Sequence, residues 1–125
     1  LSVHERLSWN DLFALYRECD LVVIPLKAGI TYPSGIRALF ETMVMMRPFI
    51  ATRNEVLQEY AREGEHGIMV PAGDVAALRD AILSNLVREP RIAAMVEKSA
   101  RLIKSQYDIR VFVDQFEVVL KNLLR

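Results

Sequence analysis

The sequence predicts an α/β fold: a partial, Rossmann-like parallel sheet of three to four strands flanked by helices. Three short aliphatic runs alternate with segments whose apolar residues recur at helical spacing. The runs are apolar on both faces, which is typical of strands buried in a parallel sheet. With 125 residues, the chain has the length of one domain. We therefore expect a single unit over residues 1–125 with two extra helices at its C-terminal end.

The first part of the chain predicts helix, strand and helix. Residues 8–11 have the pattern of a capping box, which begins a helix ending near Glu18. The run 21–25 predicts a strand that a proline ends. Ser34 resembles a second N-cap, so a helix is expected over 35–46. The expected buried side of that helix carries Ile36, Leu39, Phe40, Met43 and Val44.

Two further strands follow. Residues 48–52 form an apolar run, and Asn54 is placed to cap a short helix after it. Gly64 and Gly67 bracket a turn that leads into a third run over 68–70.

Three more helices complete the expected order. Asp74 and Asp108 are placed to cap two of them, and Pro90 stands in the favoured first turn of the other. The helix after Asp74 carries Val75, Leu78, Ile82 and Leu86, and the one after Asp108 carries Val111, Phe112, Phe116, Val119, Leu120 and Leu123.

Composition excludes several classes of protein. Sixteen basic and sixteen acidic side chains leave no net charge, which argues against a nucleic-acid partner. The apolar runs are far shorter than the ~20 residues of a membrane span. The single cysteine, Cys19, fits a reducing compartment, so we expect a cytoplasmic protein. His4, His66 and Cys19 have no metal-ligand spacing, so no metal site is expected.

The segment 27–36 is the first candidate binding site. Lys27 supplies a cation, and the segment supplies two glycines, hydroxyl side chains and a helix start. Free N–H groups at Ser34, Gly35 and Ile36, with the positive end of the helix dipole, would suit a phosphate or diphosphate. The alternative is a capped helix that follows an ordinary loop.

Glu41 is the second candidate. It lies between Phe40 and Met43 in an otherwise apolar helix, where an unpaired carboxylate would be costly. In a cleft, its oxygens could accept hydrogen bonds from a vicinal diol. The alternative is an exposed glutamate paired with Arg37 one turn earlier.

Three segments together resemble the retaining glycosyltransferases of the GT-B fold, family 4-like (glycosyl transferases group 1). Residues 19–25, CDLVVIP, look like that family's aDvvvlP; residues 39–52, LFETMVMMRPFIAT, resemble LEAMAxGxPVIAT; residues 64–74, GEHGIMVPAGD, resemble dGxnGxLVxPgD. Their order and spacing match. The resemblance implies the C-terminal, donor-binding part of such an enzyme, with the N-terminal domain and the first two strand–helix units outside this chain.

The resemblance also assigns roles to residues. Glu41 takes the place of the second glutamate of the E-x7-E motif, which bonds the ribose hydroxyls of the nucleotide. Ser34, Gly35 and Ile36 fall where backbone amides hold the donor diphosphate, and Lys27, which is not a motif position, could contribute. Pro33 stands where the first glutamate is expected, and no catalytic residue is assigned.

The implied reaction is transfer of a sugar from a nucleotide-diphosphate donor to an acceptor, with retained configuration and no metal or other cofactor. The chain alone is expected to be inactive, because catalysis needs the cleft shared with the N-terminal domain. Peripheral association of the parent with the inner face of a membrane stays open. The alternatives are a non-catalytic nucleotide-binding module, which Pro33 favours, and a protein-interaction module on the same scaffold.

The strand order typical of this family, 3-2-1-4-5-6, has one more consequence. Residues 2–4 would be the third strand and residues 21–24 the fourth, which leaves the fourth strand without its neighbour. An unpaired apolar edge invites pairing. We therefore expect either that the first strand moves to this edge or that a second copy of the chain joins it.

Overall fold

The computed structural model describes residues 2–30, 32–85 and 89–124. Three parallel strands form its sheet in the order β1 (Val22–Ile24), β2 (Phe49–Thr52) and β3 (Ile68–Val70). Every residue of the central strand β2 is buried. The expected α/β class and parallel sheet are confirmed.

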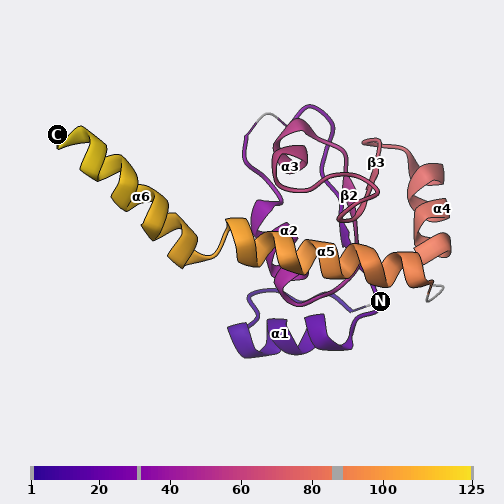
Figure 1. The fold of residues 1–125 in the computed structure, drawn as a ribbon. Helices are drawn as coiled ribbons and strands as arrows, with labels where there is room; N and C mark the ends of the chain where they lie inside the picture. The colour runs from indigo at the N-terminus through magenta and orange to yellow at the C-terminus, as the bar shows by residue number, and fades with distance from the viewer. Residues whose placement is uncertain (1, 31, 86–88, 125) are drawn as a thin grey trace.

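Helices cover both faces of the sheet (Figure 1). On one face lie α2 (Ile36–Val44), α3 (Glu55–Tyr60) and α5 (Pro90–Gln106). Their apolar residues meet the strands in one core, which includes Leu39, Met43, Leu57 and Ile103 from the helices. The opposite face is covered by α4 (Val75–Asn85), which packs on β2 and β3 and leaves the β1 side of that face open.

The expected polar caps form at three helices. Asn54 Oδ1 accepts the Leu57 N–H at 2.9 Å, and Asp74 Oδ1 accepts the Ala77 N–H at 2.8 Å. Asp108 caps α6 (Ile109–Leu123) in the same way, and Pro90 begins α5. These contacts are local, so residue order alone was enough to predict them.

Helix α1 (Trp9–Glu18) begins at Ser8, whose hydroxyl accepts the Asp11 N–H at 3.2 Å. Within the described residues, the Asp11 carboxylate accepts a hydrogen bond from that hydroxyl and not from a backbone N–H. One half of the expected capping box is therefore present.

The structure corrects three details of α2. Its N-cap is Gly35, with φ of +80°, and not Ser34, because the chain enters the helix through a left-handed turn that glycine favours. The helix ends at Val44 rather than at residue 46, because Met46 adopts φ of +53°. Val44, expected on the buried side, is 59% exposed.

Residues 2–4 are not a strand. They are exposed and pair with no strand among the described residues, so the expected move of this segment to the free edge of β1 is wrong. A short segment forms a strand only where it pairs with another strand, and within the described residues this segment pairs with neither edge of the sheet. Pairing of the β1 edge with a second copy stays a prediction.

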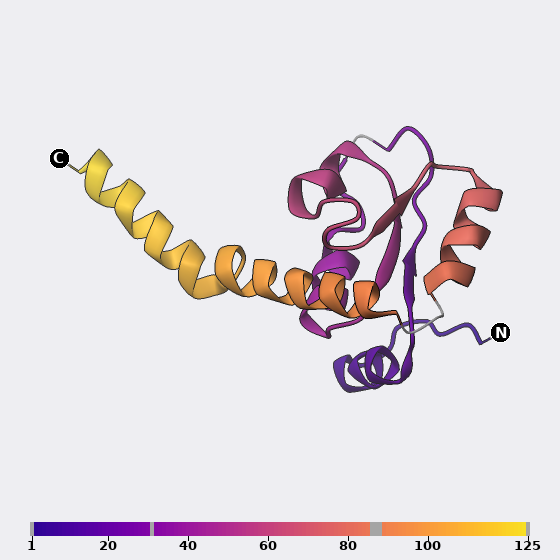
Figure 2. The same ribbon diagram turned by 45° about the vertical axis from the view of Figure 1, so that its right-hand side comes forward.

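The last helix, α6, extends away from the rest of the molecule in both views (Figures 1 and 2). None of its residues is buried, and most of its apolar residues, Phe112 and Phe116 among them, are more than half exposed. Leu86, expected in the helix after Asp74, lies outside the described residues. None of the described helices is both long enough and apolar enough to cross a membrane.

Candidate functional site

The start of α2 is the first part of the candidate site. A Cβ on Gly35 would lie 3.3 Å from Ile24 Cγ2 and 3.4 Å from Leu26 Cδ1, so glycine lets the helix begin close to the end of β1. No described side chain caps this end. The N–H groups of the first turn therefore have no side-chain partner among the described residues, and anion binding at Gly35 and Ile36 stays a prediction. Ser34 directly precedes this turn and is half-buried, whereas Thr31 lies outside the described residues.

Lys27 borders a separate polar hollow of about 350 Å³. The hollow lies where the three strands end: residues 27–30 follow β1, residues 53–56 follow β2, and Ala72 follows β3. Ligands of open α/β sheets bind at this end of the strands. Arg53 lies at its rim and donates hydrogen bonds from Nε and Nη2 to the Glu63 carboxylate. The shortest, from Nη2 to Oε2, is 2.8 Å, and the ion pair holds the guanidinium in place.

Glu41 lies two turns along α2 and faces α1. Arg37 Nε donates to its Oε1 at 2.7 Å, and the Tyr16 hydroxyl donates to its Oε2 at 3.1 Å. The side chain of Glu41 is only 16% exposed. The expected pairing with Arg37 is therefore confirmed, whereas the expectation of an exposed glutamate in that alternative is wrong.

The partners of Glu41 belong to a small polar and aromatic cluster between α1 and α2. The Arg37 guanidinium lies 4.5 Å from the centre of the Trp9 ring, a cation–π distance. Burial, together with the hydrogen bond to Glu41, raises the pKa of Tyr16. The hydroxyl is thus held protonated and donates to the carboxylate.

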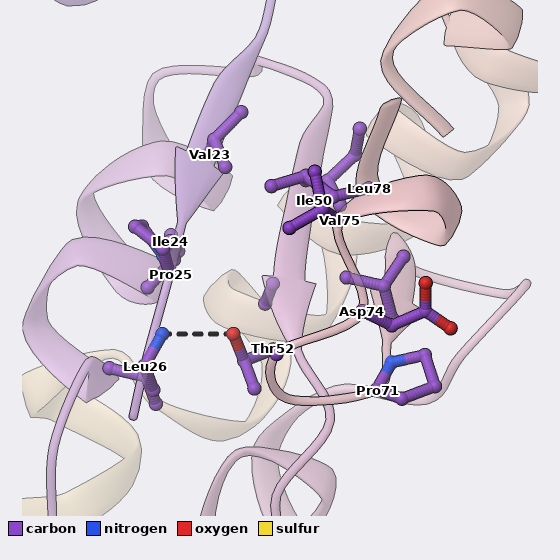
Figure 3. A pocket seen from close by; sticks show the side chains of 13 residues that line it. Val23, Ile24, Pro25, Leu26, Ile50, Thr52, Pro71, Asp74, Val75 and Leu78 are labelled. Carbon is purple, nitrogen blue, oxygen red and sulfur yellow. Dashed lines mark hydrogen bonds between the residues drawn. The ribbon is translucent and has the colours of Figure 1, made fainter. Parts of the chain in front are cut away.

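A second hollow, of about 200 Å³, lies on the open part of the sheet face beside α4 (Figure 3). Its walls are mostly apolar and include Val23, Ile50 and Leu78. The Leu26 N–H donates to Thr52 Oγ1 at 2.8 Å at its edge, which ties the loop after β1 to the end of β2. An apolar hollow with few polar groups suits packing against apolar surface better than binding a charged nucleotide.

The expected site residues fall into two groups. Gly35, Ile36 and Glu41 belong to α2 and its N-cap, with Glu41 about 9 Å beyond Gly35 along the axis, and Ser34 directly precedes them. Lys27 borders the polar hollow instead. Among the residues that the structure describes, no group of side chains could hold a metal ion.

Three residues of the site were missed by sequence reasoning. Arg53 and Asn54 line the polar hollow, and their place directly after a buried strand was a usable signal, because the ends of parallel strands meet at one edge. Tyr16 touches Glu41 across 25 positions of sequence. Spacing carries no signal for such a contact.

Comparison with known proteins gives matches in sequence and in structure. The profile of the family described as glycosyl transferases group 1 matches residues 2–88. A phosphatidyl-myo-inositol mannosyltransferase of Mycobacterium leprae is 34% identical over 114 residues, which cover 88% of this chain and 28% of that protein.

Two solved structures share the fold. The Anabaena protein Alr3699/HepE, in complex with UDP and glucose, superposes with a TM-score of 0.73 at 19% identity, over 86% of this chain and 29% of that one. The C-terminal domain of LpcC, a glycosyl transferase group 1 family protein from Francisella tularensis, superposes with a TM-score of 0.68 at 22% identity, over 86% of this chain and 53% of that domain. The chain thus spans less than a third of the mannosyltransferase and of the Anabaena protein.

Proposed function

Because the chain belongs to the glycosyl transferases group 1 family, we propose that it is the donor-binding portion of a glycosyltransferase. The reaction is transfer of a sugar from a nucleotide-diphosphate donor to an acceptor, with retention of configuration. The arrangement of α2 carries the proposal, since one helix offers uncapped amides at its start and a shielded carboxylate two turns later.

The diphosphate is assigned to the start of α2. The uncapped N–H groups near Gly35 and Ile36, after Ser34, combine with the positive end of the helix dipole to attract an anion. The same groups stabilise the negative charge that the diphosphate gains as it leaves the sugar. Lys27, at the neighbouring hollow, is exposed and long enough to add a cation.

The ribose is assigned to Glu41. A carboxylate offers about four acceptor sites, and Arg37 and Tyr16 use two of them. The remaining capacity matches the two hydroxyl donors of a vicinal diol. The Anabaena structures in complex with UDP and with UDP-glucose lend support to a nucleotide-sugar donor.

Several features of the proposal concern the parent protein. Transfer requires no metal or other cofactor, and the acceptor site and the residue that handles its proton belong to an N-terminal domain. The chain by itself is then inactive. The proposed compartment is the cytoplasm. Peripheral association of the parent protein with the inner face of a membrane is the alternative to be tested.

A non-catalytic nucleotide-binding module is the second candidate. Pro33 stands eight positions before Glu41, where the family's first motif glutamate is expected. Proline cannot accept a hydrogen bond through its side chain. Loss of that carboxylate would leave nucleotide binding intact while removing a contact to the donor sugar.

Calorimetric titration of the chain with UDP, GDP and ADP tests donor binding. We expect saturable binding of one of them, which also identifies the base. Glu41→Gln, which keeps the size of the side chain, is expected to weaken binding by about 1–3 kcal/mol. Glu97→Gln, an exposed change on α5, serves as the matched control and is expected to leave binding unchanged. Absence of binding by the folded chain would favour the protein-interaction module.

A further inference from the structure

Tyr16 is the buried residue of α1, and it reaches the carboxylate on which the proposed nucleotide site depends. The residue is 9% exposed, whereas most of α1 faces solvent. A buried hydroxyl requires a hydrogen-bond partner, and Glu41 Oε2 at 3.1 Å is that partner. The contact joins two helices that are separated by β1 in the chain.

Both oxygens of Glu41 accept a hydrogen bond, but the two donors differ in how exposed they are. Arg37, which holds Oε1, is 70% exposed, so water competes for its guanidinium, although that group also lies 4.5 Å from the centre of the Trp9 ring. Tyr16, which holds Oε2, is fixed by the packing around its ring. Tyr16 is therefore the buried one of the two partners that orient the carboxylate.

We infer that Tyr16 is a positioning residue for the donor ribose: its hydroxyl fixes one oxygen of Glu41 and thereby aims the free acceptor sites at the vicinal diol. This inference rests on the proposed function, in which Glu41 binds the ribose. It adds that α1, which precedes the donor-binding helix by a strand, is part of the nucleotide site. The raised pKa of Tyr16 agrees with this role, because the hydroxyl keeps the proton that it donates.

Tyr16→Phe tests the inference, because it removes one oxygen and keeps the ring. The probes are the nucleoside diphosphate that binds best among UDP, GDP and ADP, and its 2′,3′-dideoxy analogue, which lacks the diol. Calorimetry measures both dissociation constants. The quantity compared is the dissociation constant of the dideoxy analogue divided by that of the ribonucleotide. We expect Tyr16→Phe to lower this ratio about three- to tenfold by weakening the ribonucleotide, with the dideoxy analogue unchanged.

Tyr107→Phe is the matched control. Tyr107 packs against Phe40, the neighbour of Glu41 on α2, with ring centres 5.0 Å apart, and its hydroxyl makes no hydrogen bond within residues 2–30, 32–85 and 89–124. We expect the ratio to stay at its wild-type value in this variant. Tyr16→Met, which fills the same space with a flexible apolar chain, is the second variant if Tyr16→Phe does not fold, and the same loss is expected.

The outcomes separate the inference from the function on which it rests. A wild-type ratio near one means that Glu41 does not bind the diol. That result overturns the proposed role of Glu41 and this inference with it. A wild-type ratio that Tyr16→Phe leaves unchanged overturns the inference alone. Equal weakening of both nucleotides by Tyr16→Phe also overturns it, because a purely structural role would weaken both.

Discussion

The hydrogen bond from the Leu26 N–H to Thr52 Oγ1 allows a direct test of how the sheet holds the loop that leads to the binding site. Thr52 is 7% exposed at the end of β2, and Leu26 is half-buried just after β1. Thr52→Val keeps the shape of the side chain and removes the acceptor, 2.8 Å from the Leu26 nitrogen. The change leaves that N–H without its partner.

The expected cost is about 1–2 kcal/mol of unfolding free energy. A fully buried donor that loses its partner costs about 1–3 kcal/mol, and the lower part of this range applies because water can reach a half-buried group. Urea unfolding at fixed pH measures the cost. The slope of free energy against urea should not change, since the folded state stays compact.

Thr42→Val is the matched control. Thr42 is fully buried on α2, but its hydroxyl donates to the Ala38 carbonyl one turn earlier, at 2.7 Å. That carbonyl already accepts a hydrogen bond within the helix, so we expect a change below about 0.5 kcal/mol. Equal costs for the two variants, or no measurable cost for Thr52→Val, would refute the argument that the cost arises at the Leu26 N–H.

Two further expectations follow from packing and from titration. A Cβ on Gly67 would overlap the Phe49 ring in the core, so Gly67→Ala is expected to cost about 1–3 kcal/mol in urea unfolding; no measurable loss would count against the steric cause. Burial lowers the pKa of His66, whose Nδ1 accepts the Arg62 N–H. Because the lowered pKa favours the neutral ring in the folded state, stability should be complete above the ordinary histidine pKa of 6.5 and fall as pH drops through the folded pKa. Unfolding measured between pH 8 and about 5 checks this against His66→Gln, which should lack that fall.

The sequence by itself determined the class of the fold and the family. Caps such as Asn54 and Asp108 act on neighbours two or three positions away, and the aliphatic run of β2 must be buried wherever it packs. The pairing of Arg37 with Glu41 is also local, because residues four apart lie on one face of a helix. Contacts of this kind are determined by position along the chain.

Tertiary structure alone decided which distant groups meet. The contacts of Tyr16 with Glu41 and of Leu26 with Thr52 join different elements, and helical or strand periodicity does not say which neighbour a face will find. The same reason explains the errors. Residues 2–4 have the composition of a strand but pair with none among the described residues, and the apolar side of α6 has the pattern of a packed helix but no buried residue. Local preference sets what an element can be, and burial against another element decides what it becomes.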